Sequence, residues 1–168
     1  MQYPTKLQTS RLLLSALSEG DVDFIFRLLN TPGWLAFIGD RKIHSADDAL
    51  RYIQKILANG ELQYWKVVLA SSGEAVGMIT LLQRDYLSHP DIGFAFLPDH
   101  AGQGLAFEAA GAVKALVLDH EQDKILHAVC LPTNTRSISL IKRLGFLFDR
   151  QARVEDETLD VYTFTLRQ

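Results

Sequence analysis

The sequence predicts a mixed α/β fold and places residues 1–168 in one domain. Segments with apolar residues at helical spacing alternate along the chain with short apolar runs of strand length. Turn and cap signals separate these segments, but no linker, internal repeat or low-complexity tract divides the chain. A chain of 168 residues is long enough for one domain with a substantial core.

Cap signals position the first helix. Ser18-Glu19-Gly20-Asp21 resembles a capping box and predicts a helix after it, with apolar residues at helical spacing up to Leu29. Pro32-Gly33 is expected to end this helix. The segment 34–38 that follows is apolar but short.

The other elements follow from the same signals. The expected strands are residues 11–17, 64–70, 75–82, 91–97, 123–131, 146–152 and 158–166. The expected further helices run from a second capping-box candidate at 45–48 through Leu57, over 104–120, and over 134–144, before Gly145.

Charge and cysteine content narrow the functional classes. The net charge of −3 gives no reason to expect nucleic-acid or membrane binding by bulk electrostatics. Cys130 is the only cysteine, so the chain cannot form an intrachain disulfide, and a reducing compartment fits. The segment 1–6 lacks the apolar core of a signal peptide, and no apolar run approaches the ~20 residues that span a bilayer. A cytoplasmic protein is expected.

The most informative segment is a glycine-bearing loop between the strand at 91–97 and the helix at 104–120. Gly102, Gly104 and Ala106 carry almost no side chain, so an anion can approach their backbone closely. The first turn of a helix has unpaired N–H donors, and the helix dipole favours negative charge there. The loop therefore predicts a phosphate site, although the two glycines could equally shape an ordinary turn.

The two common phosphate loops do not match this segment. A dinucleotide fingerprint needs a third glycine where Phe107 lies, and it usually follows the first strand of the fold. A nucleoside-triphosphate P-loop needs Gly-Lys-Ser/Thr, whereas this chain has Gly104-Leu105-Ala106.

Five motifs in order resemble the GCN5-related N-acetyltransferase (GNAT) superfamily, specifically its RimJ/RimL-like branch of ribosomal-protein N-terminal acetyltransferases. The matches span nearly the whole chain. They are Thr9-Ser10-Arg11-Leu12-Leu13-Leu14 (T-E-R-L-x-L), Ile92-Gly93-Phe94 through Pro98 (I-G-Y-W-L-x-P), residues 102–109 (G-x-G-Y-A-x-E-A), Asn134-Thr135-Arg136-Ser137 (N-x-x-S) and Leu144-Gly145-Phe146 (L-G-F).

The resemblance implies a central mixed, largely antiparallel, twisted sheet of about seven strands flanked by helices. In that fold, the strand at 123–131 would diverge from the strand at 91–97 and leave a notch for acetyl-CoA. The resemblance places the pyrophosphate on the amides of Gly102, Gln103, Gly104, Leu105 and Ala106. It places the pantetheine arm along the backbone of Phe96 and Leu97, with Asn134 on the far side. Asn134 would also suit a helix N-cap.

Three residues depart from the branch pattern. Ala101 lies where Trp is frequent, Leu105 replaces a frequent Tyr, and Ala95 falls in an aromatic strand segment. Binding through loop amides does not depend on these side chains. The departures instead affect the walls of the acceptor pocket, so the sequence does not define the acceptor.

The implied reaction is direct acetyl transfer to a primary amine through a tetrahedral intermediate, whose oxyanion a strand N–H can stabilise. Asp91 is the candidate base, with a solvated strand-start residue as the alternative. Asp85 and His89 are second candidates. Ser137 is the candidate proton donor to the leaving thiolate, although its hydroxyl could instead bond a helical carbonyl.

Other side chains have weaker claims. Tyr86 is a second candidate acid, and Cys130 lies in an apolar strand pattern typical of a small buried hydrophobe. The five histidines show no metal-ligand spacing, so no metal is expected. His100, beside the glycine loop, could contact phosphate or simply lie at the surface.

The acceptor is the least defined part of the prediction. A protein N-terminal α-amino group is preferred, following the branch. A small-molecule amine such as a polyamine or an antibiotic is the alternative, as is a non-catalytic acyl-CoA-binding module. Trp34, Phe37 and Ile38 could form one wall of the acceptor groove or belong to the core. The sequence is compatible with a monomer or a homodimer.

Overall fold

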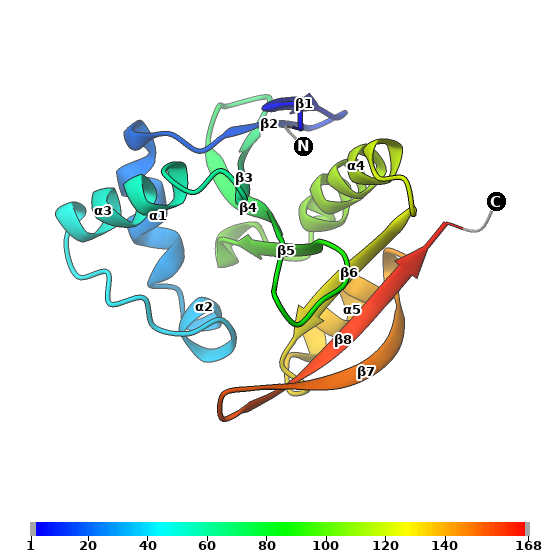
Figure 1. Ribbon diagram of the computed structural model, residues 1–168. Helices are drawn as coiled ribbons and strands as arrows, with labels where there is room; N and C mark the ends of the chain where they lie inside the picture. The colour runs from blue at the N-terminus through cyan, green and yellow to red at the C-terminus, as the bar shows by residue number, and fades with distance from the viewer. Residues whose placement is uncertain (1–2, 167–168) are drawn as a thin grey trace.

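One continuous sheet of eight strands organises the computed structural model, which describes residues 3–166 (Figure 1). Met1 and Gln2, part of the segment tested for a signal peptide, lie outside the described residues. The strand order is β1-β2-β3-β4-β5-β6-β8-β7, and every neighbouring pair is antiparallel except β5 and β6. The strands are β1 (Lys6–Gln8), β2 (Leu12–Ala16), β3 (Gln63–Leu69), β4 (Ala75–Leu82), β5 (Asp91–Phe96), β6 (Ile125–Cys130), β7 (Leu147–Val154) and β8 (Glu157–Thr165).

Helices cover both faces of this sheet. They are α1 (Val22–Leu29), α2 (Pro32–Phe37), α3 (Ala46–Leu57), α4 (Leu105–His120) and α5 (Thr135–Arg143), with short 3₁₀ turns at Glu19–Asp21 and Pro98–His100. In Figure 1, α1, α2 and α3 lie on one side of the sheet and α4 lies on the other. The predicted mixed, largely antiparallel α/β architecture is confirmed.

Two apolar clusters follow from this arrangement. One joins α4 and α5 to the sheet, and the other joins α1, α2 and α3 to its opposite face. Successive residues of a strand point to opposite faces, so Met78 belongs to the α1–α3 cluster and Ile79 to the α4 cluster. The sheet is therefore buried on both sides at β4.

Two local features were not expected. Pro32-Gly33 follows the end of α1 at Leu29, as predicted, but it also begins α2, which the Thr31 hydroxyl caps by accepting the Trp34 N–H at 3.3 Å. Proline suits the first helical position because the N–H that it lacks has no helical partner there. The strand β1 was not expected, because three residues are too few to show an alternating pattern.

The two predicted N-terminal caps are present. Ser18 and Asp21 form the capping box that leads into α1, and the Ser45 hydroxyl accepts the Asp48 N–H at 3.1 Å at the start of α3. These caps pair backbone donors that the helices themselves leave free.

The strands β5 and β6 diverge, as predicted. They are paired only at Asp91 and His127, where the His127 N–H also donates to the Pro90 carbonyl at 2.9 Å. Beyond this point, β5 stays paired with β4, and β6 stays paired with β8 along its length. The edge of β5 that faces β6 is therefore open from about Gly93 to Phe96.

No helix within residues 3–166 is long and apolar enough to cross a membrane. Over the same range, no group of three or more His, Cys, Asp or Glu side chains is arranged to hold a metal ion.

Replacing Gly77 by alanine is expected to destabilise the sheet beside the open edge. Gly77 lies opposite Phe96, and a Cβ at Gly77 would come within 2.5 Å of the Phe96 ring. Overpacking of this kind costs about 1–3 kcal/mol, so Gly77→Ala is expected to lower the free energy of unfolding in urea by that amount. Gly60→Ala is the control, because a Cβ at Gly60 meets nothing within 4 Å. Equal stability of the two variants would contradict this packing.

Candidate active site

A cleft of about 1010 Å³ lies beside the open end of β5. Its walls come from α2, the end of β5, the glycine loop with the start of α4, and α5. A smaller pocket of about 390 Å³, between β2, α3 and β3, contains none of the predicted site residues.

The cleft brings together nearly all of the predicted site. Its lining includes every predicted cofactor residue and the candidate acid: Phe96, Leu97, Gly102, Gln103, Gly104, Leu105, Ala106, Asn134 and Ser137. The candidate base Asp91 is not part of the lining. Neither are Asp85, Tyr86, His89 or Cys130.

The glycine loop presents a row of free backbone donors. Gly102 and Gly104 have φ angles of 78° and 77°, which favour glycine, and Gly104 is the N-cap of α4. The first backbone hydrogen bond of α4 runs from the Glu108 N–H to the Gly104 carbonyl at 3.0 Å. The N–H groups of Leu105, Ala106 and Phe107 thus have no intrahelical acceptor. The loop fits a pyrophosphate, because these donors and the dipole of a 16-residue helix lie together.

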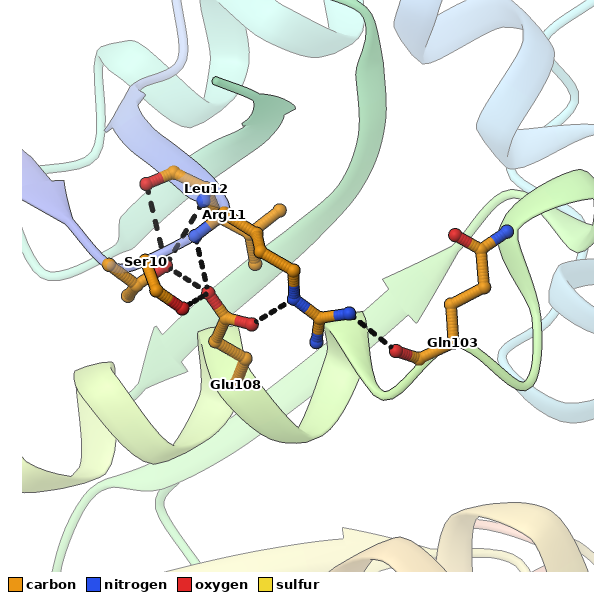
Figure 2. A network of polar contacts seen from close by, with 6 residues as sticks. Ser10, Arg11, Leu12, Gln103 and Glu108 are labelled. Carbon is orange, nitrogen blue, oxygen red and sulfur yellow. Dashed lines mark hydrogen bonds and ion pairs between the residues drawn. The ribbon is translucent and has the colours of Figure 1, made fainter. Parts of the chain in front are cut away.

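An ion-pair network fixes this loop from the other end of the chain (Figure 2). The Arg11 guanidinium donates to Glu108 at 2.6 Å through Nε and to the Gln103 carbonyl at 2.8 Å through Nη1. The Arg11 N–H and the Thr9 hydroxyl also donate to Glu108, at 2.9 and 2.5 Å. The turn between β1 and β2 therefore holds both the loop and the first turn of α4.

These contacts determine the charge of Glu108. Partial burial alone would raise the pKa of the Glu108 carboxyl, but the hydrogen bonds from Thr9 and Arg11 and the Arg11 charge lower it to about 2. Glu108 is therefore ionised at neutral pH, and its ion pair with Arg11 is maintained.

The start of α5 forms the opposite wall. Asn134 is the N-cap of this helix, and its side-chain oxygen accepts the Ser137 N–H at 3.2 Å. The capping role of Asn134 is therefore present, and its side-chain N–H₂ is the group left for another partner. Ser137 is half-buried and lines the cleft.

Asp91 has a different environment. Its side chain is 2% exposed, and its carboxylate accepts Arg84 Nε at 2.8 Å. Burial raises the pKa of the Asp91 carboxyl, and Arg84 opposes that rise. Asp91 lies at the closed end of the β5–β6 gap, five residues before Phe96, which corresponds to roughly 16 Å along a strand.

Cys130 is also unsuited to direct chemistry. It is 8% exposed, and burial raises the pKa of its thiol to about 11, assisted by Asp160 and opposed by Ser137. A thiol with this pKa is protonated at neutral pH, so it is a poor nucleophile.

The apolar residues of α2 divide between two roles. Trp34 is buried in the cluster with α1 and α3, whereas Phe37 and Ile38 are 37% and 40% exposed. All three line the cleft. Trp34 therefore has the predicted core position, whereas Phe37 and Ile38 present exposed apolar surface to the cleft.

Sequence reasoning missed the part of the cleft formed by Arg143. Arg143 lines the cleft, and its guanidinium lies over the Phe107 ring, 4.8 Å from the ring centre. His100, for which the sequence left a phosphate contact or a surface position open, also lines the cleft, and its Nε2 lies 3.2 Å from the Glu74 carboxylate. The stacking pair is 36 residues apart in the sequence, and no local pattern signals such a contact.

Comparison with known proteins identifies the class. The model of the acetyltransferase (GNAT) domain family matches residues 11–147, so the chain belongs to this family. It is a GNAT acetyltransferase, as the motifs predicted. This family uses acetyl-CoA as the acetyl donor.

Individual relatives share the length and the fold of this chain. The Bacillus subtilis protein YkkB is 24% identical over 166 residues, covering 96% of both chains. The GNAT acetyltransferase from Bacillus anthracis has a TM-score of 0.80 at 19% identity, covering 95% of this chain and 98% of its own. RimL, a ribosomal-protein α-N-acetyltransferase in complex with coenzyme A, has a TM-score of 0.80 at 15% identity, covering 98% and 97%.

The Arg11–Glu108 ion pair predicts a specific pH dependence of stability. Because the pKa of Glu108 is about 2 in the folded protein, below its usual value near 4.5, this contribution is present above pH 4.5 and is lost as the pH falls towards 2. Glu108→Gln is expected to lower the free energy of unfolding by about 1 kcal/mol at pH 7, since Arg11 is half exposed and solvent screens the pair.

Urea unfolding at several pH values between 7 and 3 measures this effect. The difference between Glu108→Gln and the wild type should narrow as the pH falls below 4.5. Glu61→Gln is the matched control, because Glu61 is exposed and forms no ion pair among the described residues. A difference that is independent of pH would argue against the ion pair.

Proposed function

We propose that this protein transfers the acetyl group of acetyl-CoA to a primary amine, with a protein N-terminal α-amino group as the preferred acceptor. The observation that carries the proposal is the cleft itself. Free loop amides, an open strand edge and the start of α5 border one space of about 1010 Å³. Acetyl-CoA needs the loop amides for its pyrophosphate, the open strand edge for its amide-bearing arm and the start of α5 for its thiol end.

The open edge of β5 supports binding of the pantetheine arm. The Leu97 N–H donates to the Val76 carbonyl on β4, and the Leu97 carbonyl accepts the His100 N–H. Backbone groups alternate in direction along a strand, so those of Phe94 and Phe96 point into the gap towards β6. We therefore place the arm on Phe96, as the sequence suggested, and move the second backbone contact from Leu97 to Phe94.

The reaction requires one bond exchange and the movement of two protons. The amine nitrogen bonds to the acetyl carbon, the carbon–sulfur bond breaks, the nitrogen loses a proton and the sulfur gains one. The Phe94 N–H supports the negative oxygen that develops at the carbonyl, which leaves the Phe94 carbonyl for contact with the arm. Ser137 is our candidate donor of a proton to the leaving thiolate, because this residue lines the cleft at the start of α5.

The proton that leaves the amine needs an acceptor. Asp91 was the sequence-based candidate, but its ion pair with Arg84 and its position outside the cleft lining favour a positioning role at the closed end of the gap. We propose that water in the cleft receives this proton and that Asp91 keeps β5 and β6 paired at Asp91 and His127.

The acceptor preference rests on likeness to the RimJ/RimL-like branch. RimL, described as a ribosomal-protein α-N-acetyltransferase, shares the fold at a TM-score of 0.80. A small-molecule amine acetyltransferase and a non-catalytic acyl-CoA-binding module are the alternatives. Measuring the release of free CoA from acetyl-CoA with a panel of peptides and small amines distinguishes these three functions. Release with peptides supports the proposal, release with small amines supports the first alternative, and binding without release supports the second.

Gly102→Asp is expected to weaken acetyl-CoA binding at least ten-fold, measured by calorimetry. A Cβ at Gly102 meets nothing within 4 Å, so the new carboxylate clashes with no atom and repels the pyrophosphate, although the φ of 78° strains the backbone of any side-chain-bearing residue. Gly73→Asp is the matched control: its φ is 74°, its surroundings are equally open, and it lies in the β3–β4 turn. Equal affinities of the two variants would show that the loop does not hold the diphosphate.

Ser137→Ala is expected to lower kcat by about 10²-fold, because one proton transfer is lost, while leaving the Kd for acetyl-CoA within two-fold. The cap of α5 survives, since it uses the Ser137 backbone N–H. Ser139→Ala, on the same helix and also lining the cleft, is the control and should retain kcat. Steady-state kinetics with a saturating amine measures both variants, and an unchanged kcat for Ser137→Ala would remove Ser137 from the chemistry.

A further inference from the structure

We infer that the acceptor amine carries an apolar side chain, aromatic or branched, next to its nitrogen and no second positive charge. This inference rests on the proposed function, because it concerns the acceptor of the same reaction. It derives from the end of the cleft opposite α5, where α2 faces the open part of β5.

The charges around the cleft disfavour a polycation. Among the described residues that line the cleft, none is Asp or Glu, and its two arginines, Arg136 and Arg143, lie on α5 at the opposite end. Glu74 contacts His100 but is not part of the lining. A polyamine or an aminoglycoside would have to give up the hydration of several ammonium groups without gaining a carboxylate partner, which is unfavourable.

The α2 wall offers a different complement. Phe37 and Ile38 are exposed towards the cleft at the C-terminal end of α2, over the buried Trp34. On the face of the sheet that carries α2, the lining includes Ala95 and Leu97, which belong to the same apolar cluster as Trp34. An apolar side chain between these two walls would be removed from water on both sides, which is the main source of affinity for such a group.

The exposure of α2 is informative because its exposed apolar residues do not all face the cleft. Leu35 is 42% exposed, much like Phe37 and Ile38, but it is not part of the lining. The same short helix therefore supplies two residues that can touch an acceptor and one of the same character that cannot.

A peptide panel tests the preference. The peptides share one uncharged sequence and differ only in the first residue, which is Phe, Leu, Ser or Lys; spermidine and phenethylamine complete the panel. We expect kcat/KM to be at least ten-fold higher for Phe or Leu than for Ser, and higher still relative to Lys and spermidine. Comparing the Phe peptide with phenethylamine distinguishes a peptide acceptor from a small apolar amine. A preference for Lys or spermidine would overturn the inference.

A charge placed on α2 gives the matched mutational test. Phe37→Asp should lower kcat/KM for the Phe peptide at least ten-fold and raise it for the Lys peptide, with the KM for acetyl-CoA unchanged. Leu35→Asp, of equal exposure on the same helix, should leave both values as in the wild type. If Phe37→Asp has a lower melting temperature than the wild type, the Ile38→Asp variant is used in its place.

The outcomes distinguish a failure of the acceptor inference from a failure of the proposed function. Acetylation of amines without the expected preference, or an equal effect of Phe37→Asp on all acceptors, overturns the apolar acceptor but leaves the proposed function intact. Binding of acetyl-CoA without acetylation of any amine overturns the proposed function and the acceptor inference with it.

Discussion

An open strand edge is the constraint on which the rest of this structure depends. Backbone N–H and C=O groups need partners, and a strand inside a sheet normally finds them on both sides. Here β5 loses its β6 partner after Asp91 and His127 but keeps β4 along its whole length. The backbone N–H and C=O groups on the β6 side of β5 are therefore held rigidly, and they remain available to a ligand. Pairing of β6 with β8 directs β6 away, so the final hairpin, far from the glycine loop in sequence, contributes to the gap.

Binding at this edge also requires a fixed anion site, and the chain supplies it from two distant segments. The glycine loop continues β5 into α4, so the diphosphate donors and the open edge share one piece of backbone. Without further support, a loop with two left-handed glycines is conformationally free. Arg11 restricts that freedom by binding the Gln103 carbonyl and Glu108 together. The β1–β2 turn therefore contributes to the site even though none of its residues lines the cleft.

Most of the fold, and the gathering of the predicted cofactor residues around one cleft, could be predicted because their signals are local. Small residues before a helix, or Asn134 three residues before Ser137, are visible within a few positions of the sequence. The contact between Arg11 and Glu108 spans 97 residues and exists only once the sheet is assembled. Asp91 shows a different limit, since a carboxylate at the start of a strand looks the same whether it faces a substrate or Arg84. Pro32 illustrates a third, because proline follows one helix and begins the next, and only the Thr31 cap distinguishes these cases.

The sequence defines the proposed donor site well but leaves the acceptor undetermined. This difference follows from the groups that form each site, which are backbone groups for the donor and side chains for the acceptor. In the proposed function, backbone amides and a strand edge hold the donor, and these tolerate side-chain changes such as Leu105 in place of a frequent Tyr. The proposed acceptor contacts lie at the end of α2, a six-residue helix on which Phe37 is exposed. We therefore expect changes at Phe37 or Ile38 to cost little stability while altering what the cleft accepts. A fold built in this way keeps one chemistry and can exchange its acceptors, so acceptor identity has to be inferred from α2 rather than from the motifs that reveal the family.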